Sequence, residues 1–175
     1  MKKIVITGGL GYIGTELCKI YSGTSWNDQI VVIDNRFISE RVNQLRNWNI
    51  DFFQGDILDK DFIKKHLEDA DVVHHLAGIT NVPRTQSESS KESDEKIKLV
   101  AEKGTQNILD TISKNCKIIF PSTHVVYEGV DKAKIDIKEE ETTKPVLSYS
   151  SSKNVNEKQL KESGKNYVIL RLWSV

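Results

Sequence analysis

The sequence has few cysteines, no long apolar stretch and no excess of either charge. Its two cysteines, Cys18 and Cys116, make no disulfide framework, and small buried apolar roles in a reduced, cytoplasmic chain are the simpler expectation. No segment approaches the roughly 20 apolar residues of a membrane-spanning helix. The apolar run after Met1 meets glycines too early for a signal peptide. A formal net charge of zero gives no global attraction to nucleic acid or to anionic membranes, so neither is expected as a partner.

Short apolar runs alternate with amphipathic stretches along 175 residues, a length that suits one compact domain. Strands are expected at residues 2–7, 30–34, 50–54, 71–76, 117–120 and 167–172. Helices are expected at 12–22 closed by Gly23, at 39–48, at 59–68 capped by Asp59, around 97–112, and at 148–162 capped by Ser148 and ended by Gly164, with polar or irregular chain at 80–94 and 128–144. Because parallel strands need long crossovers, the pattern predicts an α/β fold: a doubly wound parallel sheet with Rossmann-like dinucleotide-binding topology.

A glycine-rich turn joins the first strand to the first helix. Glycines recur as G-x-x-G-x-x-G at Gly8, Gly11 and Gly14, and free N–H groups at a helix N-terminus suit a pyrophosphate. Asp34 ends the next apolar run, twenty residues after Gly14, where a carboxylate can accept hydrogen bonds from an adenosine ribose. Glycine turns also serve plain packing, and Asp34 could be an ordinary strand-end carboxylate, but the two signals together favour a dinucleotide site.

A tyrosine and a lysine share one face of the last expected helix. Tyr149 and Lys153 stand at i and i+4, and a nearby ammonium lowers the pKa of a phenol, which could then act as a base. By itself this spacing is also common on solvated helix faces. The pair Ser122 and Thr123 follows the fifth strand, where a hydroxyl could either hydrogen-bond a substrate oxygen or cap the strand end.

Eight segments together resemble a known family. In order along the chain they are Thr7–Gly14, Val32–Asn35, Gly55–Leu58, His75–Gly78, Gly104–Leu109, Ser122–Tyr127, Tyr149–Lys153 and Leu170–Leu172. The chain resembles the N-terminal part of an extended short-chain dehydrogenase/reductase, in the NAD-dependent epimerase/dehydratase family. The segments span almost the whole sequence, and jointly they are far more specific than any one of them.

The resemblance implies a cofactor, a substrate class and roles for individual residues. It implies NAD as cofactor, a nucleotide sugar as substrate, and a homodimer formed through helices at 94–113 and 149–163. The catalytic group would be Thr123, Tyr149 and Lys153, the last also holding the nicotinamide ribose together with Tyr149. The remaining cofactor-binding residues would be Gly8, Gly11, Tyr12 and Ile13 for the pyrophosphate, Asp34, Asn35, Asp56 and Ile57 for the adenosine, and Leu76, Ala77, Gly78 and Thr80 for the nicotinamide channel.

The sequence departs from the family pattern at several positions. Ala101 stands where the family usually has asparagine, and Glu128 is an extra residue before Gly129. His124 and Val125 replace the acid and base of sugar 4,6-dehydratases, so epimerisation or 4-keto reduction is favoured over dehydration. A dehydratase relative and a cofactor-binding module without catalysis remain as alternatives.

The choice of cofactor and the end of the chain carry two further expectations. NAD is favoured over NADP, because Asp34 would repel a 2′-phosphate, although Arg36 lies near. The chain stops soon after the sixth strand, with Ser174 where the family has asparagine. We therefore expect residues 1–175 to be an NAD-binding Rossmann-like domain, a fragment that lacks a C-terminal substrate-binding portion.

The histidines give no metal site. His74 and His75 are adjacent on an expected strand and point to opposite faces, so they cannot share one metal. His66 fits the apolar stripe of a helix, and His124 lies beside the expected chemistry with an open role. The acidic run at 139–141 is expected to be solvated.

Overall fold

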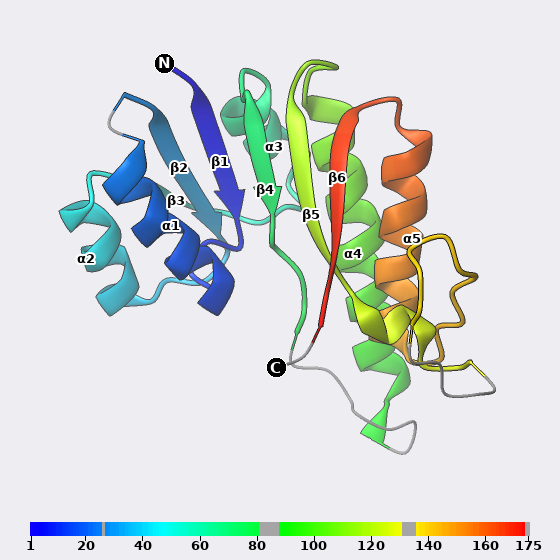
Figure 1. Cartoon of the computed structure of the whole chain (residues 1–175). Coiled ribbons are helices and arrows are strands. Elements are labelled where there is room, and N and C mark those ends of the chain that lie inside the picture. The colour runs from blue at the N-terminus through cyan, green and yellow to red at the C-terminus, as the bar shows by residue number, and fades with distance from the viewer. Residues whose placement is uncertain (26, 81–87, 131–135, 174–175) are drawn as a thin grey trace.

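Six parallel strands form one sheet, in the order β3-β2-β1-β4-β5-β6, with helices on both faces (Figure 1). The computed structural model describes residues 1–25, 27–80, 88–130 and 136–173. The strands are β1 Lys3–Thr7, β2 Gln29–Asp34, β3 Asp51–Gln54, β4 Val72–His75, β5 Lys117–Thr123 and β6 Asn166–Leu172. The helices are α1 Tyr12–Thr24, α2 Ser39–Asn47, α3 Lys60–Leu67, α4 Lys91–Thr111 and α5 Ser148–Glu162, with a 3₁₀ helix at His124–Tyr127.

The order in which successive strands are added to the sheet changes side between β1 and β4, although all strands remain parallel. The first three strands run outward from β1 to one side, and β4, β5 and β6 run outward to the other (Figure 1). Thr7, the last residue of β1, is paired with Ile33 of β2 and with His75 of β4. Ligands of doubly wound sheets bind beyond the carboxyl ends of the strands at such a reversal, so the topology marks this edge as the place to look for a site.

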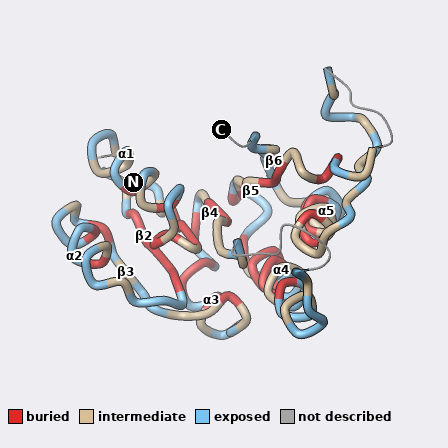
Figure 2. Tube along the Cα trace, turned by 90° about the horizontal axis from the view of Figure 1, so that it is seen from below, coloured by how far each residue is buried: buried red, intermediate tan, exposed pale blue. Residues whose placement is uncertain are grey.

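The core consists of two apolar clusters, one on each face of the sheet. Alternate residues of β1 separate them, with Val5 on one side and Ile4 and Ile6 on the other. Helices α3, α4 and α5 pack on the Val5 side, whereas α1 and α2 pack on the opposite side (Figure 2). This two-sided burial explains why the strands of the sheet centre are almost continuously apolar.

Strand β6 forms an edge of the sheet and is less covered. Its apolar side chains each remain at least 36% exposed at Tyr167, Val168, Leu170 and Leu172. Strand β3 is the other edge and is also mainly exposed. The best-covered part of the sheet is therefore its middle, around β1, β2, β4 and β5.

The predicted fold class and most element positions are confirmed, and Asp59 caps α3 by accepting a hydrogen bond from the Phe62 N–H at 3.0 Å. Some boundaries are wrong. Helix α1 continues through Gly23 to Thr24, because this glycine has no steric or conformational reason to end it, and Ser25 is the cap. Ser148 is not a cap but the first residue of α5.

The expected loop at 80–94 is also wrong at its end. Helix α4 already begins at Lys91, and Ser90 caps it by accepting a hydrogen bond from the Ser93 N–H at 3.2 Å. The stretch 81–87 of this loop lies outside the described residues. Strand β5 runs three residues further than expected, to Thr123, because β6 pairs with it along its whole length.

Both cysteines are free and buried, as expected of small apolar residues. Burial raises the pKa of the Cys18 thiol to about 12 and that of Cys116 to about 11, so both stay protonated at neutral pH. None of the helices within the described ranges is long and apolar enough to cross a lipid bilayer.

Candidate functional site

A cleft of about 1150 Å³ opens at the carboxyl ends of the central strands. Its volume is somewhat above the roughly 300–1,000 Å³ that is common for small-molecule sites, so the cleft has room for an elongated ligand. Every residue to which the sequence analysis gave a cofactor or catalytic role lines this cleft: Gly8, Gly11, Tyr12, Ile13, Asp34, Asn35, Asp56, Ile57, Leu76, Ala77, Gly78, Thr80, Thr123, Tyr149 and Lys153. The fold therefore brings together residues that lie up to 145 positions apart in the sequence.

The glycine turn is packed too tightly for larger residues. Gly8 has a φ of 70°, and a Cβ there would lie 2.6 Å from the Ala77 backbone nitrogen. A Cβ on Gly14 would lie 2.6 Å from the Cα of Gly9. Gly8 thus lets β1 turn directly against the end of β4, and Gly14 lets α1 start close to the turn.

The N-terminus of α1 opens into the cleft without an internal partner for its charge. Gly11 is the N-cap, has no side chain to accept from the first turn, and the first turn contains no acidic residue. Gly11, Tyr12, Ile13 and Gly14 all line the cleft. Free N–H groups and the positive end of a helix dipole make this position suitable for an anion such as a diphosphate.

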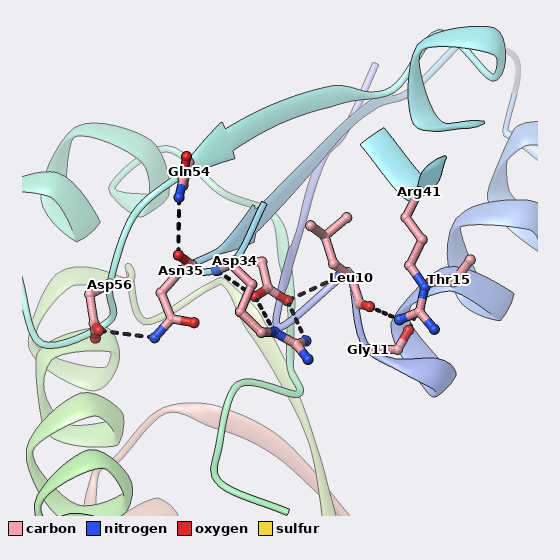
Figure 3. A network of polar contacts seen from close by, with 9 residues as sticks. Leu10, Gly11, Thr15, Asp34, Asn35, Arg41, Gln54 and Asp56 are labelled. Atoms are coloured by element: carbon pink, nitrogen blue, oxygen red, sulfur yellow. Dashed lines mark hydrogen bonds and ion pairs between the residues drawn. The ribbon is translucent and has the colours of Figure 1, made fainter. Parts of the chain in front are cut away.

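A polar network surrounds the carboxyl end of β2 (Figure 3). The Asp34 carboxylate is only 4% exposed and accepts hydrogen bonds from the Leu10 N–H and from the backbone and guanidinium of Arg36. Asn35 donates through Nδ2 to Asp56 at 3.1 Å, and Asp56 also accepts from the Leu58 N–H at 2.9 Å. The residues expected to hold an adenosine are thus fixed to one another.

Two features of this end of the cleft escaped the sequence analysis. Arg41 of α2 donates to the Leu10 carbonyl and lines the cleft, but nothing in its sequence context distinguishes it from other surface arginines. Ile57 lines the cleft yet is 5% exposed, and its carbonyl accepts from Asn107 Nδ2 at 3.0 Å. Its side chain therefore belongs mainly to the core, and what it can offer a ligand is chiefly backbone.

Lys153 is partly buried beneath the opposite end of the cleft. Its ammonium donates to the Pro121 carbonyl at 2.9 Å and lies 4.4 Å from the centre of the Phe120 ring. Burial lowers the pKa of Lys153 to about 8. A lysine of this kind is still mostly protonated at neutral pH, but it loses its proton far more easily than an exposed lysine.

The pKa of the Tyr149 phenol is shifted in the direction opposite to the expected one. Burial raises the pKa of Tyr149, whereas the sequence analysis expected the neighbouring ammonium to lower it. The Lys153 ammonium lies 5.9 Å from the centre of the tyrosine ring and is hydrogen-bonded to a carbonyl, so it does not offset the desolvation of the phenolate. Further positive charge from a bound ligand would be needed to bring the pKa of Tyr149 towards neutrality.

The two hydroxyls at the end of β5 have different surroundings. Thr123 caps the following 3₁₀ helix by accepting a hydrogen bond from the Val125 N–H at 3.2 Å, which leaves its own proton available to donate. Ser122 donates to Glu157 at 2.6 Å, and Glu157 forms a two-pronged ion pair with Arg171 at 2.9 and 2.7 Å. Both residues line the cleft, but the Ser122 hydroxyl donates to Glu157 and so ties β5 to α5 and β6.

The extra residue Glu128 stabilises the start of α5. Its Oε1 accepts hydrogen bonds from the N–H groups of Val146 and Leu147, both at 2.7 Å, and from the Ser150 hydroxyl. Helix α5 has no side-chain cap of its own at Leu147. Glu128 takes over that function for the helix that carries Tyr149 and Lys153, a role its position alone did not reveal.

The histidines lie as the strand alternation predicts. His74 contacts the Tyr21 hydroxyl at 2.7 Å on one face of the sheet, and His75 lies on the other face between Thr7 and Thr105 at 3.0 and 2.9 Å. Desolvation lowers the pKa of His75 to about 3, so it is neutral. His124 stacks on Trp173 with ring centres 4.4 Å apart, close to the Thr123 end of the cleft.

Comparison with protein families gives one match over most of the chain. The profile of the 3-beta hydroxysteroid dehydrogenase/isomerase family, which is part of the extended short-chain dehydrogenase/reductases, matches residues 5–169.

Curated relatives include enzymes named for nucleotide-sugar substrates. A dTDP-D-glucose 4,6-dehydratase of Dictyostelium discoideum is 31% identical over 170 residues, covering 87% of this chain and 38% of the relative. A UDP-glucose 4-epimerase of Neisseria meningitidis serogroup C is 29% identical over 173 residues, covering 93% of this chain and 48% of the relative. The chain thus spans about half the length, or less, of these relatives.

Solved structures share the fold across nearly the whole chain. UDP-glucose 4-epimerase from Brucella ovis, solved in complex with NAD, matches 99% of this chain and 52% of its own, with 28% identity and a TM-score of 0.80. UDP-glucuronic acid 4-epimerase from Bacillus cereus, solved with UDP-glucuronic acid and NAD, matches 97% of this chain and 55% of its own, with 29% identity and a TM-score of 0.79.

Proposed function

The chain belongs to the extended short-chain dehydrogenase/reductase family, and from that premise we propose that it is the NAD-binding part of a nucleotide-sugar epimerase or oxidoreductase. The observation that carries the proposal is that one cleft has an open helix N-terminus at one end and the Tyr149–Lys153 pair at the other. An NAD molecule laid along it would place its diphosphate at Gly11–Ile13 and its adenosine at Asp34, Asn35 and Asp56. Its nicotinamide would lie between Leu76–Thr80 and Tyr149.

The residues of the chain fit the proton half of such a reaction. Thr123 would donate its hydroxyl proton in a hydrogen bond to the reacting sugar oxygen, and Tyr149, in its phenolate form, would accept the proton of the sugar hydroxyl. Because burial raises the pKa of Tyr149 and Lys153 does not offset this, the phenolate would also need the positive charge of a bound ligand. Lys153 would hold the nicotinamide ribose, and with a pKa of about 8 it is mainly protonated at pH 7. A nicotinamide bound here would supply the acceptor for a hydride.

The relatives favour a nucleotide sugar as substrate. Although the matching family is named for steroid chemistry, the curated relatives given above are UDP-glucose and dTDP-glucose enzymes, and the Bacillus cereus structure holds a UDP-sugar. Among reactions on sugars, we favour epimerisation or simple keto reduction over dehydration. The residues after Thr123 are His124 and Val125, and valine has no group that can act as an acid or base.

Which part of the protein binds the cofactor and which binds the sugar is also a proposal. Since the matched relatives and structures are about twice as long as this chain, we propose that residues 1–175 form the cofactor-binding domain and that sugar binding needs additional polypeptide. The free, buried cysteines and the absence of a membrane-spanning helix within the described ranges support a cytoplasmic location.

A homodimer through α4 and α5 is the proposed assembly. The two helices already pack as a pair, with Asn156 donating to the Ala101 carbonyl and Gln159 to that of Glu102, both at 3.0 Å. Light scattering at micromolar concentration tests this, since a monomer there would contradict it.

The catalytic part of the proposal is tested by Tyr149→Phe. A screen of UDP- and dTDP-sugars with the whole protein identifies a substrate, by chromatographic separation of the epimeric product or, for net oxidation or reduction, by the absorbance of reduced nicotinamide at about 340 nm. Tyr149→Phe is then expected to lose about a thousandfold in turnover, within the range of general acid–base catalysis, while NADH binding is retained. Tyr167→Phe, at the far end of β6, is the matched control. Full turnover of Tyr149→Phe would remove this residue from the mechanism, and NADH binding without turnover of any sugar nucleotide by the whole protein would favour a non-catalytic binding module.

A further inference from the structure

Asn107 of α4 holds a turn that lies at one end of the cleft. The residue is fully buried, and its Nδ2 donates to the Ile57 carbonyl at 3.0 Å and to the Leu58 carbonyl at 3.1 Å. A side-chain amide nitrogen carries two protons, so both of its donors are used on this turn. The two bonds therefore join α4 to the segment that follows β3, which lies 50 residues earlier in the sequence.

The amide of Asn107 is oriented for the turn rather than for its own surroundings. Within the described ranges, Asn107 Oδ1 is the only fully buried side-chain oxygen or nitrogen without a hydrogen-bond partner. Turning the amide over would place this oxygen against two carbonyl oxygens and leave both of them without a donor. A buried acceptor without a donor destabilises a fold, and an apolar side chain at this position would bring none. Packing of the core alone therefore does not explain an asparagine here.

The same face of α4 also receives the side chain of the turn. Gly104 precedes Asn107 by three residues, so the two lie on one face of the helix. A Cβ on Gly104 would lie 2.3 Å from Ile57 Cδ1. Ile57 thus packs directly against the helix where residue 104 has no side chain, and Asn107 binds the backbone of the same turn.

The turn is closed by its own hydrogen bonds and placed by those of Asn107. The Asp59 N–H donates to the Asp56 carbonyl at 3.1 Å, and the Leu58 N–H donates to Asp56 Oδ1 at 2.9 Å. These bonds set the shape of the turn, whereas the bonds from Asn107 set its position relative to α4. Asp56, Ile57 and Leu58 line the cleft, but Asn107 does not. Asn107 can therefore act on a ligand only through the turn.

We propose that Asn107 is a positioning residue for cofactor binding, which fixes the turn at 56–59 under the adenosine end of a dinucleotide without touching the ligand. The inference rests on the proposed dinucleotide site and adds to it a residue outside the cleft. Helix α4 also holds the helix of Tyr149 and Lys153, because Asn156 donates to the Ala101 carbonyl at 3.0 Å. One helix thus sets the spacing between the surfaces for the two ends of the cofactor.

Titrations with NADH and with ADP, which carries only the adenosine half, test this on the wild-type chain and on variants. Asn107→Ala removes both donors and should weaken the binding of both ligands by the same factor, at least about tenfold. Asn107→Leu also removes the donors, but it refills the space and removes the unpaired oxygen. Its free energy of unfolding should exceed that of Asn107→Ala, whereas its affinity for ADP should be just as low. A purely structural role would instead make affinity follow stability.

Ile118→Ala is the matched control for a loss of stability. Ile118 is fully buried in the same core cluster as Ile57, and it lies near the amino end of β5, away from the carboxyl ends where the cleft opens. This variant should unfold more easily than wild type, yet bind NADH and ADP with unchanged affinity. Circular dichroism under the conditions of the titration checks that each variant is folded.

The outcomes separate this inference from the function on which it rests. Weakened ADP binding by both folded Asn107 variants, with unchanged binding by Ile118→Ala, supports the role of Asn107. Wild-type affinity for ADP in folded Asn107→Leu, equal weakening in Ile118→Ala, or loss of the fold in both Asn107 variants overturns it and leaves the NAD site intact. NADH binding without ADP binding by wild type also overturns it. Failure of wild type to bind NADH overturns the proposed function itself.

Discussion

Replacement of Glu128 should weaken the helix that carries the proposed catalytic pair. The carboxylate accepts two backbone hydrogen bonds of 2.7 Å and one from the Ser150 hydroxyl, and so caps α5 from outside the helix. Loss of a helix cap costs about 0.5–2 kcal/mol. Glu128 is an exposed residue, so water can replace part of what is lost, and we expect Glu128→Ala to reduce the free energy of unfolding by about 1–2 kcal/mol.

The same effect should depend on pH. Burial acts to raise the pKa of Glu128, but the hydrogen bonds from Ser150, Leu147 and Val146 outweigh it, and the net pKa is lowered. A group with a lowered pKa in the folded state stabilises the fold above its unfolded pKa, about 4.3 for glutamate, and this stabilisation fades as the pH falls through the folded pKa. The difference between wild type and Glu128→Ala should therefore be largest near neutral pH and shrink in acid.

Urea unfolding followed by far-ultraviolet circular dichroism, at pH 7 and near pH 4, measures this difference. Glu140→Ala, in the exposed acidic run, removes a glutamate from the same connecting segment without removing a cap, and should match wild type at both pH values. Glu128→Gln keeps an oxygen acceptor and should fall between wild type and Glu128→Ala at pH 7. A loss below about 0.3 kcal/mol at pH 7, or one that does not depend on pH, would refute the capping role.

Three further predictions concern single side chains. Lys153→Met should raise the free energy of unfolding at pH 7 by about 2 kcal/mol, because burial lowers the pKa of Lys153 to about 8 and the protonated lysine therefore destabilises the folded state. The added stability should disappear above about pH 10.4, where the lysine is neutral in the folded and the unfolded state. An unchanged free energy of unfolding at pH 7 would contradict this. Glu157→Gln should cost about 3 kcal/mol in urea unfolding, since it leaves the Arg171 guanidinium partly buried without its charge partner, and a cost below about 1 kcal/mol would argue against that pair. Gly8→Ala should reduce the free energy of unfolding by more than about 2 kcal/mol, because the φ of Gly8 is 70° and the added Cβ would lie 2.6 Å from Ala77 N. Gly23→Ala, inside α1 with no atom within 4 Å of the added Cβ, should instead stabilise the fold by about 0.5–1 kcal/mol. Equal effects of the two substitutions would be inconsistent with this geometry.

The sequence predicted the architecture because its local signals agree with the global fold. Apolar runs such as 30–33 bury both of their faces between two layers of helices, and the glycines of 8–14 fit a tight strand-to-helix turn. The predicted ends of helices and strands were wrong where contacts between distant segments determine them. Strand β5 is extended to Thr123 by its partner β6, and helix α5 is capped by Glu128 from eighteen residues away.

The composition of the cleft was predictable, but its electrostatics were not. Motif spacing placed Asp34, Tyr149 and Lys153 at the same cleft. The pKa direction of Tyr149 and the pairing of Asp34 with Arg36 depend on burial and on side-chain positions that spacing does not contain. The residues at 81–87, part of the expected polar loop, and Ser174 lie outside the described residues, so the expectations for them remain predictions.

The central claim is that a dinucleotide places its diphosphate at the N-terminus of α1, and calorimetric titration with NADH tests it most directly on wild type and two matched variants. Ile13→Glu puts a carboxylate in the first turn, where it lines the cleft and is compatible with the helix, and Ile20→Glu puts the same group further along α1, outside the cleft, at a residue that is 58% exposed. The account predicts that wild type and Ile20→Glu bind NADH with similar affinity and that Ile13→Glu binds at least about tenfold more weakly, a difference of about 1.4 kcal/mol. No heat of binding for wild type, or equal affinities in all three proteins, would contradict it.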